Sequence, residues 1–220
     1  MSTKTMLADF PKEKLYKWAL WLSFITIGYN VIEGAVATWF GAHDETLALF
    51  GFGVDSFVEV ISGLGIAHMI LRMRRQEYNG VDEFEITALR ITGTAFYILV
   101  TGLIVGASLA IYTGAEPQTT FVGIIISTLS ILTMYALYYY KMKIGKALNS
   151  GPIISDAKCT KTCFYLSFIL LGSSLLYELF TIPYVDALGS LGIAYYAFKE
   201  GREAFEKAAK RKIACADDCC

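Results

Sequence analysis

Two acidic side chains interrupt a long apolar stretch at residues 47–73. Asp55 and Glu59 are four positions apart, so on a helix they lie on the same face, one turn from each other. Two carboxylates at that spacing repel each other unless a cation or protons lie between them. The pair therefore predicts a cation site. The alternative is that both groups are protonated and hydrogen-bonded to neighbouring helices.

Two cysteines repeat this spacing in a second apolar stretch. Cys159 and Cys163 are also four positions apart, and Asp156 and Lys158 mark a polar lead-in before them. Two thiols and two carboxylates would complete a four-ligand site if the two stretches pack together. Thiolates favour zinc, cadmium, mercury or monovalent copper over magnesium or calcium. The alternative is that both cysteines are small apolar core residues.

The composition specifies the elements that must position these side chains. Of the 220 residues, 55% are hydrophobic and 18% are charged, against about 25% charged in ordinary globular proteins, and the mean hydropathy is +0.49. A helix needs roughly 20 apolar residues to cross a bilayer. The apolar blocks lie at 16–39, 47–73, 91–112, 121–140, 163–180 and 185–198. We therefore expect an all-α membrane protein, a bundle of six transmembrane helices.

The basic residues orient this bundle. None of the 19 Lys and Arg residues lies in the short turns 41–46, 113–120 and 181–184. Because Lys and Arg concentrate in cytoplasmic connections, both termini and the connections after the second and fourth helices are expected in the cytoplasm. We expect an N-terminal arm at 1–15, the six-helix domain at 16–212 and a cysteine-containing tail at 213–220.

Charge and cysteine usage argue against other classes of protein. The net charge is −1 and no segment forms a basic stripe, so nucleic acid is not an expected partner. The five cysteines all fall on the side expected in the cytoplasm, where thiols stay reduced, which favours metal or redox chemistry over disulfides. No nucleophile–base pair or cofactor motif is apparent, so we do not expect an enzyme.

Further polar side chains interrupt the predicted helices, where ionisable groups are costly and tend to be functional. They are Asn30, Glu33, His68, Glu178 and Asp186. We interpret Glu33 with Asn30 either as a gate or proton relay, or as a structural contact. Glu178 is expected to be partly solvated and His68 to lie at the membrane interface.

Taken in this order along the chain, the motifs resemble the cation diffusion facilitator family of metal/proton antiporters. Residues 54–59, VDSFVE, are similar to the family's D-x3-D transport motif, with Glu59 in the second acidic place. The basic segment 141–151 resembles the connection between the family's fourth and fifth helices. Cys159 and Cys163 stand where the family has H-x3-D or D-x3-D, and residues 186–194 and 200–204 resemble its last helix and exit.

The resemblance implies a secondary transporter that exports a thiophilic divalent metal ion of the zinc, cadmium or mercury class from the cytoplasm, by proton antiport. Asp55, Glu59, Cys159 and Cys163 would hold the transported ion. It also implies a homodimer in the lipid bilayer of the cell membrane, with no prosthetic group. Cysteine in place of His or Asp favours a softer ion than the family's usual zinc or manganese.

The C-terminal tail supports an alternative functional hypothesis. No counterpart of the family's cytoplasmic C-terminal metal-binding domain is expected after residue 212. The tail cysteines Cys215, Cys219 and Cys220 either capture a soft metal or have no role. A rival hypothesis is a non-transporting membrane sensor or accessory subunit that binds metal through this tail.

The predicted helix limits leave one geometric conflict. They place the two thiols nearer the cytoplasmic face than the two acids. A shared site therefore requires a tilted or deeper fifth helix, or a cavity open to the inside.

Overall fold

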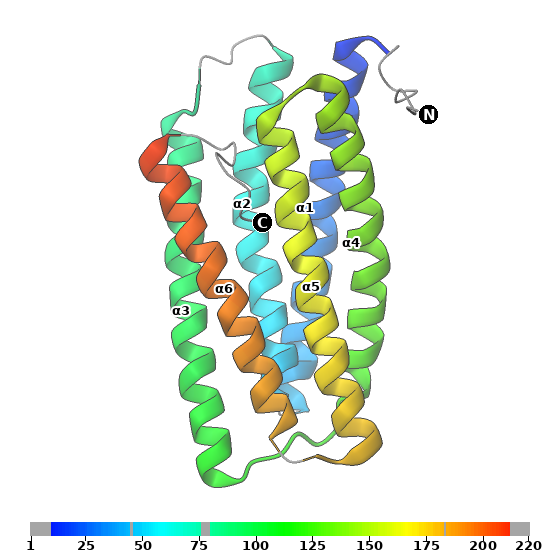
Figure 1. Cartoon of the computed structure of the whole chain (residues 1–220), viewed down its shortest axis with the longest axis vertical. Coiled ribbons are helices and arrows are strands. Elements are labelled where there is room, and N and C mark those ends of the chain that lie inside the picture. The colour runs from blue at the N-terminus through cyan, green and yellow to red at the C-terminus, as the bar shows by residue number, and fades with distance from the viewer. Residues whose placement is uncertain (1–9, 45, 76–79, 183, 212–220) are drawn as a thin grey trace, which may run out of the picture.

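The computed structural model describes residues 10–44, 46–75, 80–182 and 184–211, and every regular element within them is an α-helix. The helices are α1 (Lys12–His43), α2 (Leu47–Arg74), α3 (Glu83–Thr113), α4 (Phe121–Leu148), α5 (Gly151–Phe180) and α6 (Val185–Lys210). Each predicted apolar block falls inside one of them (Figure 1). The expected all-α bundle of six helices is confirmed.

Several helices extend well beyond the predicted blocks, because polar sequence can continue a helix outside the hydrocarbon layer, where hydropathy no longer marks it. α3 begins at Glu83 because Asp82 caps it. The Asp82 side chain accepts a hydrogen bond from the Glu85 N–H (2.9 Å), and the Glu85 carboxylate accepts one from the Asp82 N–H (3.1 Å), which is a capping box. α5 begins at Gly151 rather than at residue 163.

Length and surface composition mark the bundle as membrane-spanning. Within the described ranges, α1 to α5 are each long and apolar enough to cross a membrane, with 28 to 32 residues. At 1.5 Å per residue they exceed the roughly 30 Å hydrocarbon core. Trp21, Ile98 and Leu132 are each at least 65% exposed on the outer surface, as expected where lipid replaces water. α6 combines an apolar first half with a charged extension after Phe198.

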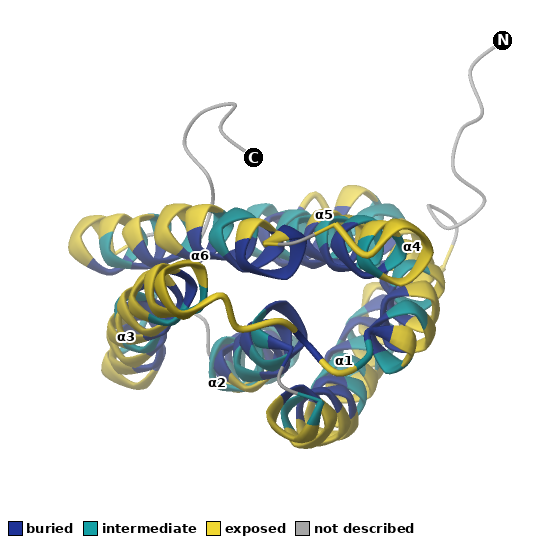
Figure 2. Ribbon diagram, turned by 90° about the horizontal axis from the view of Figure 1, so that it is seen from below, coloured by how far each residue is buried: buried dark blue, intermediate teal, exposed yellow. Residues whose placement is uncertain are grey.

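Consecutive helices run antiparallel, so the start of α1 and the end of α6 lie at the same end as the α2–α3 and α4–α5 connections (Figure 1). We name this the basic end, since it is the end at which the Lys and Arg residues gather; the positive-inside rule assigns it to the cytoplasm. The opposite end is named the outer end. Viewed from the outer end, α4, α5 and α6 form one side of the bundle and α1, α2 and α3 the other (Figure 2). α2 contacts α1, α3, α5 and α6 and is therefore the central helix.

Carboxylates of α5 and α6 cap neighbouring helices at the outer end. Asp186 accepts hydrogen bonds from the N–H groups of Leu47 (2.7 Å) and Ala48 (3.3 Å), the first residues of α2. Glu178 is exposed, as expected, and also accepts one from the N–H of Thr120 (3.1 Å), directly before α4. The first N–H groups of a helix have no partner within it, so these contacts tie α2 to α6 and α4 to α5.

Glycines let α1 and α2 approach each other closely. A Cβ at Gly53 would lie 2.5 Å from the backbone nitrogen of Thr38, and one at Gly41 would lie 2.4 Å from that of Phe50. Small residues serve this purpose at helix interfaces in membranes. Because Gly53 precedes Asp55 by two residues, the same contact fixes where Asp55 lies.

The variant Gly53→Ala tests this contact. The added methyl group has no space against the α1 backbone, so we expect a loss of about 1–3 kcal/mol in the free energy of unfolding, the usual cost of overpacking. Unfolding in mixed micelles measures it. The control is Gly28→Ala, where no atom lies within 4 Å of the new Cβ; it should be neutral or stabilising by up to about 1 kcal/mol. Equal stability of the two variants would contradict the close approach.

Candidate metal-binding site

Asp55 and Glu59 lie on the inner face of α2. Asp55 is only 3% exposed and lies one turn nearer the outer end, whereas Glu59 is half-buried. Asp55 lies close enough to Glu59, to Glu33 of α1 and to Glu200 of α6 for their negative charges to repel its own. Several carboxylates therefore gather around the central helix, and such a group is stable only with protons or a cation among its members.

Three helices converge on Glu59. Its Oε2 accepts a hydrogen bond from Nδ2 of Asn30 on α1 (2.8 Å), and its Oε1 accepts one from the thiol of Cys163 on α5. Oδ1 of Asn30 is buried and has no hydrogen-bond partner within the described ranges. The fold thus brings a carboxylate of the predicted acidic pair into contact with a thiol of the predicted cysteine pair.

Cys159 lies one turn nearer the basic end than Cys163, and both line a cavity together with Glu59. The cavity has a volume of about 60 Å³, which is enough for several water molecules. Asp55 is not among its lining residues. Three of the four predicted site residues therefore share one cavity, and Asp55 lies beyond it toward the outer end.

The early start of α5 resolves the conflict between the depths of the thiols and the acids. Because α5 begins at Gly151, both cysteines lie well inside the helix rather than at its first turn. The cavity also extends from Glu59 to Glu203 and Lys207, whose side chains are 17% and 11% exposed at the basic end. Of the alternatives set by the sequence, the deeper fifth helix is present, and the cavity extends to the basic end.

The cavity carries charges that the motifs did not single out. Its lining carboxylates are those of Glu59, Asp156, Glu200 and Glu203, and its lining ammonium groups are those of Lys141 and Lys207. When all are ionised, the four carboxylates exceed the two ammonium groups by two negative charges. That excess equals the charge of one divalent cation.

Lys141 forms a buried ion pair that sequence reasoning missed. Its side chain is 3% exposed, and Nζ lies 3.0 Å from Oδ2 of Asp156 and 3.1 Å from Oγ1 of Thr160. The sequence pattern places Lys141 in the basic connection between two helices, but α4 continues to Leu148 and carries it into the bundle. The i, i+4 spacing of Asp156 and Thr160 was the available signal, and it has meaning only once α4 is known to pack against α5.

Glu33 belongs to a separate polar contact beside the site. Its carboxylate accepts hydrogen bonds from the hydroxyl groups of Tyr29 (2.9 Å) and Ser56 (3.1 Å). The Tyr29 bond lies within α1, whereas the Ser56 bond joins α1 to α2 directly next to Asp55. They give Glu33 the structural contact that was one of its two predicted interpretations, and they leave the other, a gate or proton relay, as a prediction.

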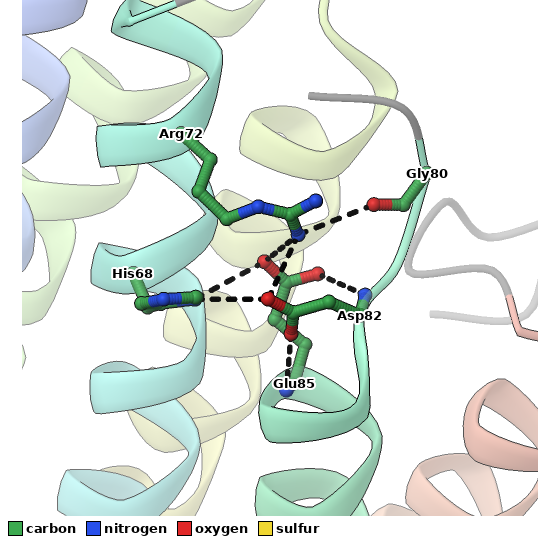
Figure 3. Close-up of polar contacts among 5 residues, drawn as sticks. All are labelled: His68, Arg72, Gly80, Asp82 and Glu85. Carbon is green, nitrogen blue, oxygen red and sulfur yellow. Dashed lines mark hydrogen bonds and ion pairs between the residues drawn. The ribbon is translucent and has the colours of Figure 1, made fainter. Parts of the chain in front are cut away.

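A second group of possible ligand atoms lies at the basic end, between α2 and α3 (Figure 3). His68, Asp82 and Glu85 offer atoms that all lie within 4.8 Å of one another. However, Nη1 of Arg72 lies 3.2 Å from the Asp82 carboxylate and 2.9 Å from that of Glu85. Because the guanidinium contacts both carboxylates and the capping box uses the same two side chains, we interpret the group as a structural link.

The predicted metal capture by Cys215, Cys219 and Cys220 concerns residues outside the described ranges, and it stays a prediction. So does the division into an arm, a six-helix domain and a tail, although α1 begins at Lys12, before the predicted limit of the arm.

The fold and cavity define a class of protein: a multi-pass integral membrane protein with ionisable and thiol side chains facing a cavity inside the bundle. Comparison with known families narrows this class. Residues 19–211 match the cation efflux transmembrane domain. The chain belongs to this family, and the resemblance noted from its motifs is confirmed.

The chain is also similar in sequence to a curated relative. The manganese efflux system protein MneP of Bacillus subtilis (strain 168) is 25% identical to it over 195 residues. The alignment covers 83% of this chain and 64% of MneP. The chain therefore spans less than two thirds of that relative's length.

The contact between Asn30 and Glu59 generates a prediction about metal affinity. Side chains that orient a ligand typically change metal affinity 10- to 100-fold when they are removed. We expect Asn30→Ala to weaken zinc or cadmium binding by about tenfold, measured by competition with a fluorescent chelator in detergent. Ser62→Ala, which alters the cavity lining without touching Glu59 in any hydrogen bond found here, is the control. Equal affinity of both variants and the native protein would contradict an orienting role for Asn30.

Proposed function

We propose that this protein exports a thiophilic divalent metal ion from the cytoplasm across the cell membrane, and that Asp55, Glu59, Cys159 and Cys163 hold the ion during transport. Membership of the cation efflux family supports export of a metal cation. The observation that carries the finer proposal is the direct contact between the Cys163 thiol of α5 and the Glu59 carboxylate of α2. It joins the two ligand pairs that the sequence places 104 residues apart.

The ligand chemistry favours a soft ion. Thiolate and carboxylate together suit zinc and its heavier relatives, whereas manganese prefers carboxylate, carbonyl and water oxygens. The relative MneP is named for manganese efflux, so manganese is the competing cargo. We rank manganese below the softer ions as the transported metal because Cys159 and Cys163 both line the cavity with Glu59.

The same contact supports proton antiport. The Cys163 thiol donates a hydrogen bond to Glu59, so a proton lies between two of the proposed ligand atoms. A metal binds thiols and carboxylates in their deprotonated forms, and its binding therefore releases protons. Exchange of the proton for the metal at one place couples the two ions without a separate proton site.

The position of the cavity supports loading from the cytoplasm. The cavity extends from Glu59 toward the basic end, whereas the outer ends of α2 and α4 are capped by Asp186 and Glu178.

A homodimer remains a prediction that rests on the family resemblance. The sensor hypothesis depends on the tail and differs in its expected result: deletion of 215–220 should leave transport intact but abolish a tail-based response.

Flux into proteoliposomes tests the proposed function. With an internal pH dye, zinc, cadmium or mercury added outside should move protons in the opposite direction, and Asp55→Ala should abolish the signal. The double variant Cys159→Ser with Cys163→Ser should lose most soft-metal flux, because hydroxyl groups are poor ligands for these ions.

Manganese is the internal control for this experiment. A protein whose cadmium flux survives loss of both thiols, or which moves manganese alone, does not use the proposed thiol site. A folded native protein that moves none of these metals would favour the sensor hypothesis.

A further inference from the structure

A lysine lies beside one of the proposed metal ligands. Nζ of Lys207, on the charged extension of α6, lies 3.9 Å from Sγ of Cys159 on α5. The same ammonium group lies 2.7 Å from Oε1 of Glu203, one turn earlier on α6. With 11% of its side chain exposed, Lys207 lies inside the mouth of the cavity rather than in free solvent.

The surroundings of Lys207 would suit a metal ion equally well. The sulfur of Cys159 and the carboxylates of Glu203 and Glu200 all line the cavity at this point. Sulfur and carboxylate oxygen are zinc and cadmium ligands, and each of them also attracts an ammonium group. A cation entering from the basic end therefore meets a position where a positive charge of the protein is already present.

The other lysine of the cavity is held differently. Lys141 is almost fully buried and is bound on two sides, by Asp156 and Thr160, from the neighbouring helix. Removing a partner from such a pair leaves an uncompensated buried charge, so Lys141 stabilises the packing of α4 on α5. Lys207 instead projects from the last turn of α6 at the mouth of the cavity, where its ion pair is with Glu203 of its own helix, and its flexible four-carbon chain allows the ammonium group to move.

We propose that Lys207 is a tethered counter-ion, which neutralises the mouth of the cavity when no metal is bound and competes with the metal for Cys159. Binding of the metal displaces the ammonium group from the sulfur, and its return favours release. Lys207 is thus a residue that sets the metal affinity of the cytoplasmic-facing state. This inference rests on the proposed function and adds a competing charge to the same site.

Removing the charge should tighten metal binding. A thiol that coordinates a metal is deprotonated by the metal itself, so the ammonium group is not needed to form the thiolate, and its loss leaves Glu203 and Glu200 to attract the metal. The Lys207 ammonium group repels a divalent ion about 4 Å away in a partly buried site. Removal of this repulsion is large enough to lower the dissociation constant at least about fivefold.

The test measures zinc and cadmium affinity in detergent-solubilised full-length protein, by competition with a fluorescent chelator under reducing conditions. Lys207→Met removes the charge but keeps the apolar stem, and should lower the dissociation constant at least about fivefold. Lys207→Arg keeps the charge and should stay within about twofold of the native value. Lys210→Gln, an exposed lysine on the same helix, controls for a general change in surface charge.

A second comparison locates the effect at the sulfur. In a Cys159→Ser background, Lys207→Met should change affinity less than it does in the native protein, because the competition for Cys159 is then absent; such non-additivity is the mark of coupled residues. Should Lys207→Met fail to fold, Lys207→Gln gives the same readout.

The outcomes separate the two hypotheses. If the native protein binds metal and Lys207→Met binds it with equal or lower affinity, the counter-ion role is overturned and the proposed function stands. Tighter binding that equals that of Lys210→Gln, or that is undiminished in the Cys159→Ser background, also overturns it. Absence of binding by both the native protein and Lys207→Met overturns the proposed function and this inference together.

Discussion

Lipid offers no hydrogen bonds to a buried polar group, and this constraint organises the bundle. A carboxylate between these helices takes its partners from other helices: Glu59 from Asn30 and Cys163, and Asp186 from the first N–H groups of α2. α2 can place Glu59 at the centre of the bundle because Asn30 and Cys163 satisfy its carboxylate. The bonds that permit this burial are also the ones that place an α2 acid beside an α5 thiol.

The two ends of the bundle satisfy this constraint in different ways. At the outer end, carboxylates of α5 and α6 cap neighbouring helices. A backbone hydrogen bond between two turns adds to these caps: the N–H of Gln118 donates to the carbonyl of Asp44 (2.9 Å). At the basic end, lysines and carboxylates line a cavity instead. Opening toward the outer end would break several hydrogen bonds at once, whereas the cavity extends toward the basic end.

Much of the fold was predictable because transfer into hydrocarbon depends mainly on local composition. Apolar blocks located the six helices, and the distribution of Lys and Arg predicts their orientation in the membrane. The polar ends of helices were not predictable in this way: α5 begins at Gly151 and α4 continues to Leu148, since outside the lipid a helix can be polar. That error hid the buried position of Lys141 and made the thiols look too shallow.

By itself, the sequence determined the number of helices and the two pairs of candidate ligands, because an i, i+4 spacing fixes a common helix face whatever surrounds it. Only the tertiary structure decided that Glu59 is the acid that contacts a thiol, that Asp55 lies beyond the cavity, and that Lys207 lies beside Cys159. Those contacts join residues 104 and 48 positions apart. They depend on how α2, α5 and α6 pack and on how far each helix extends, which no local pattern encodes.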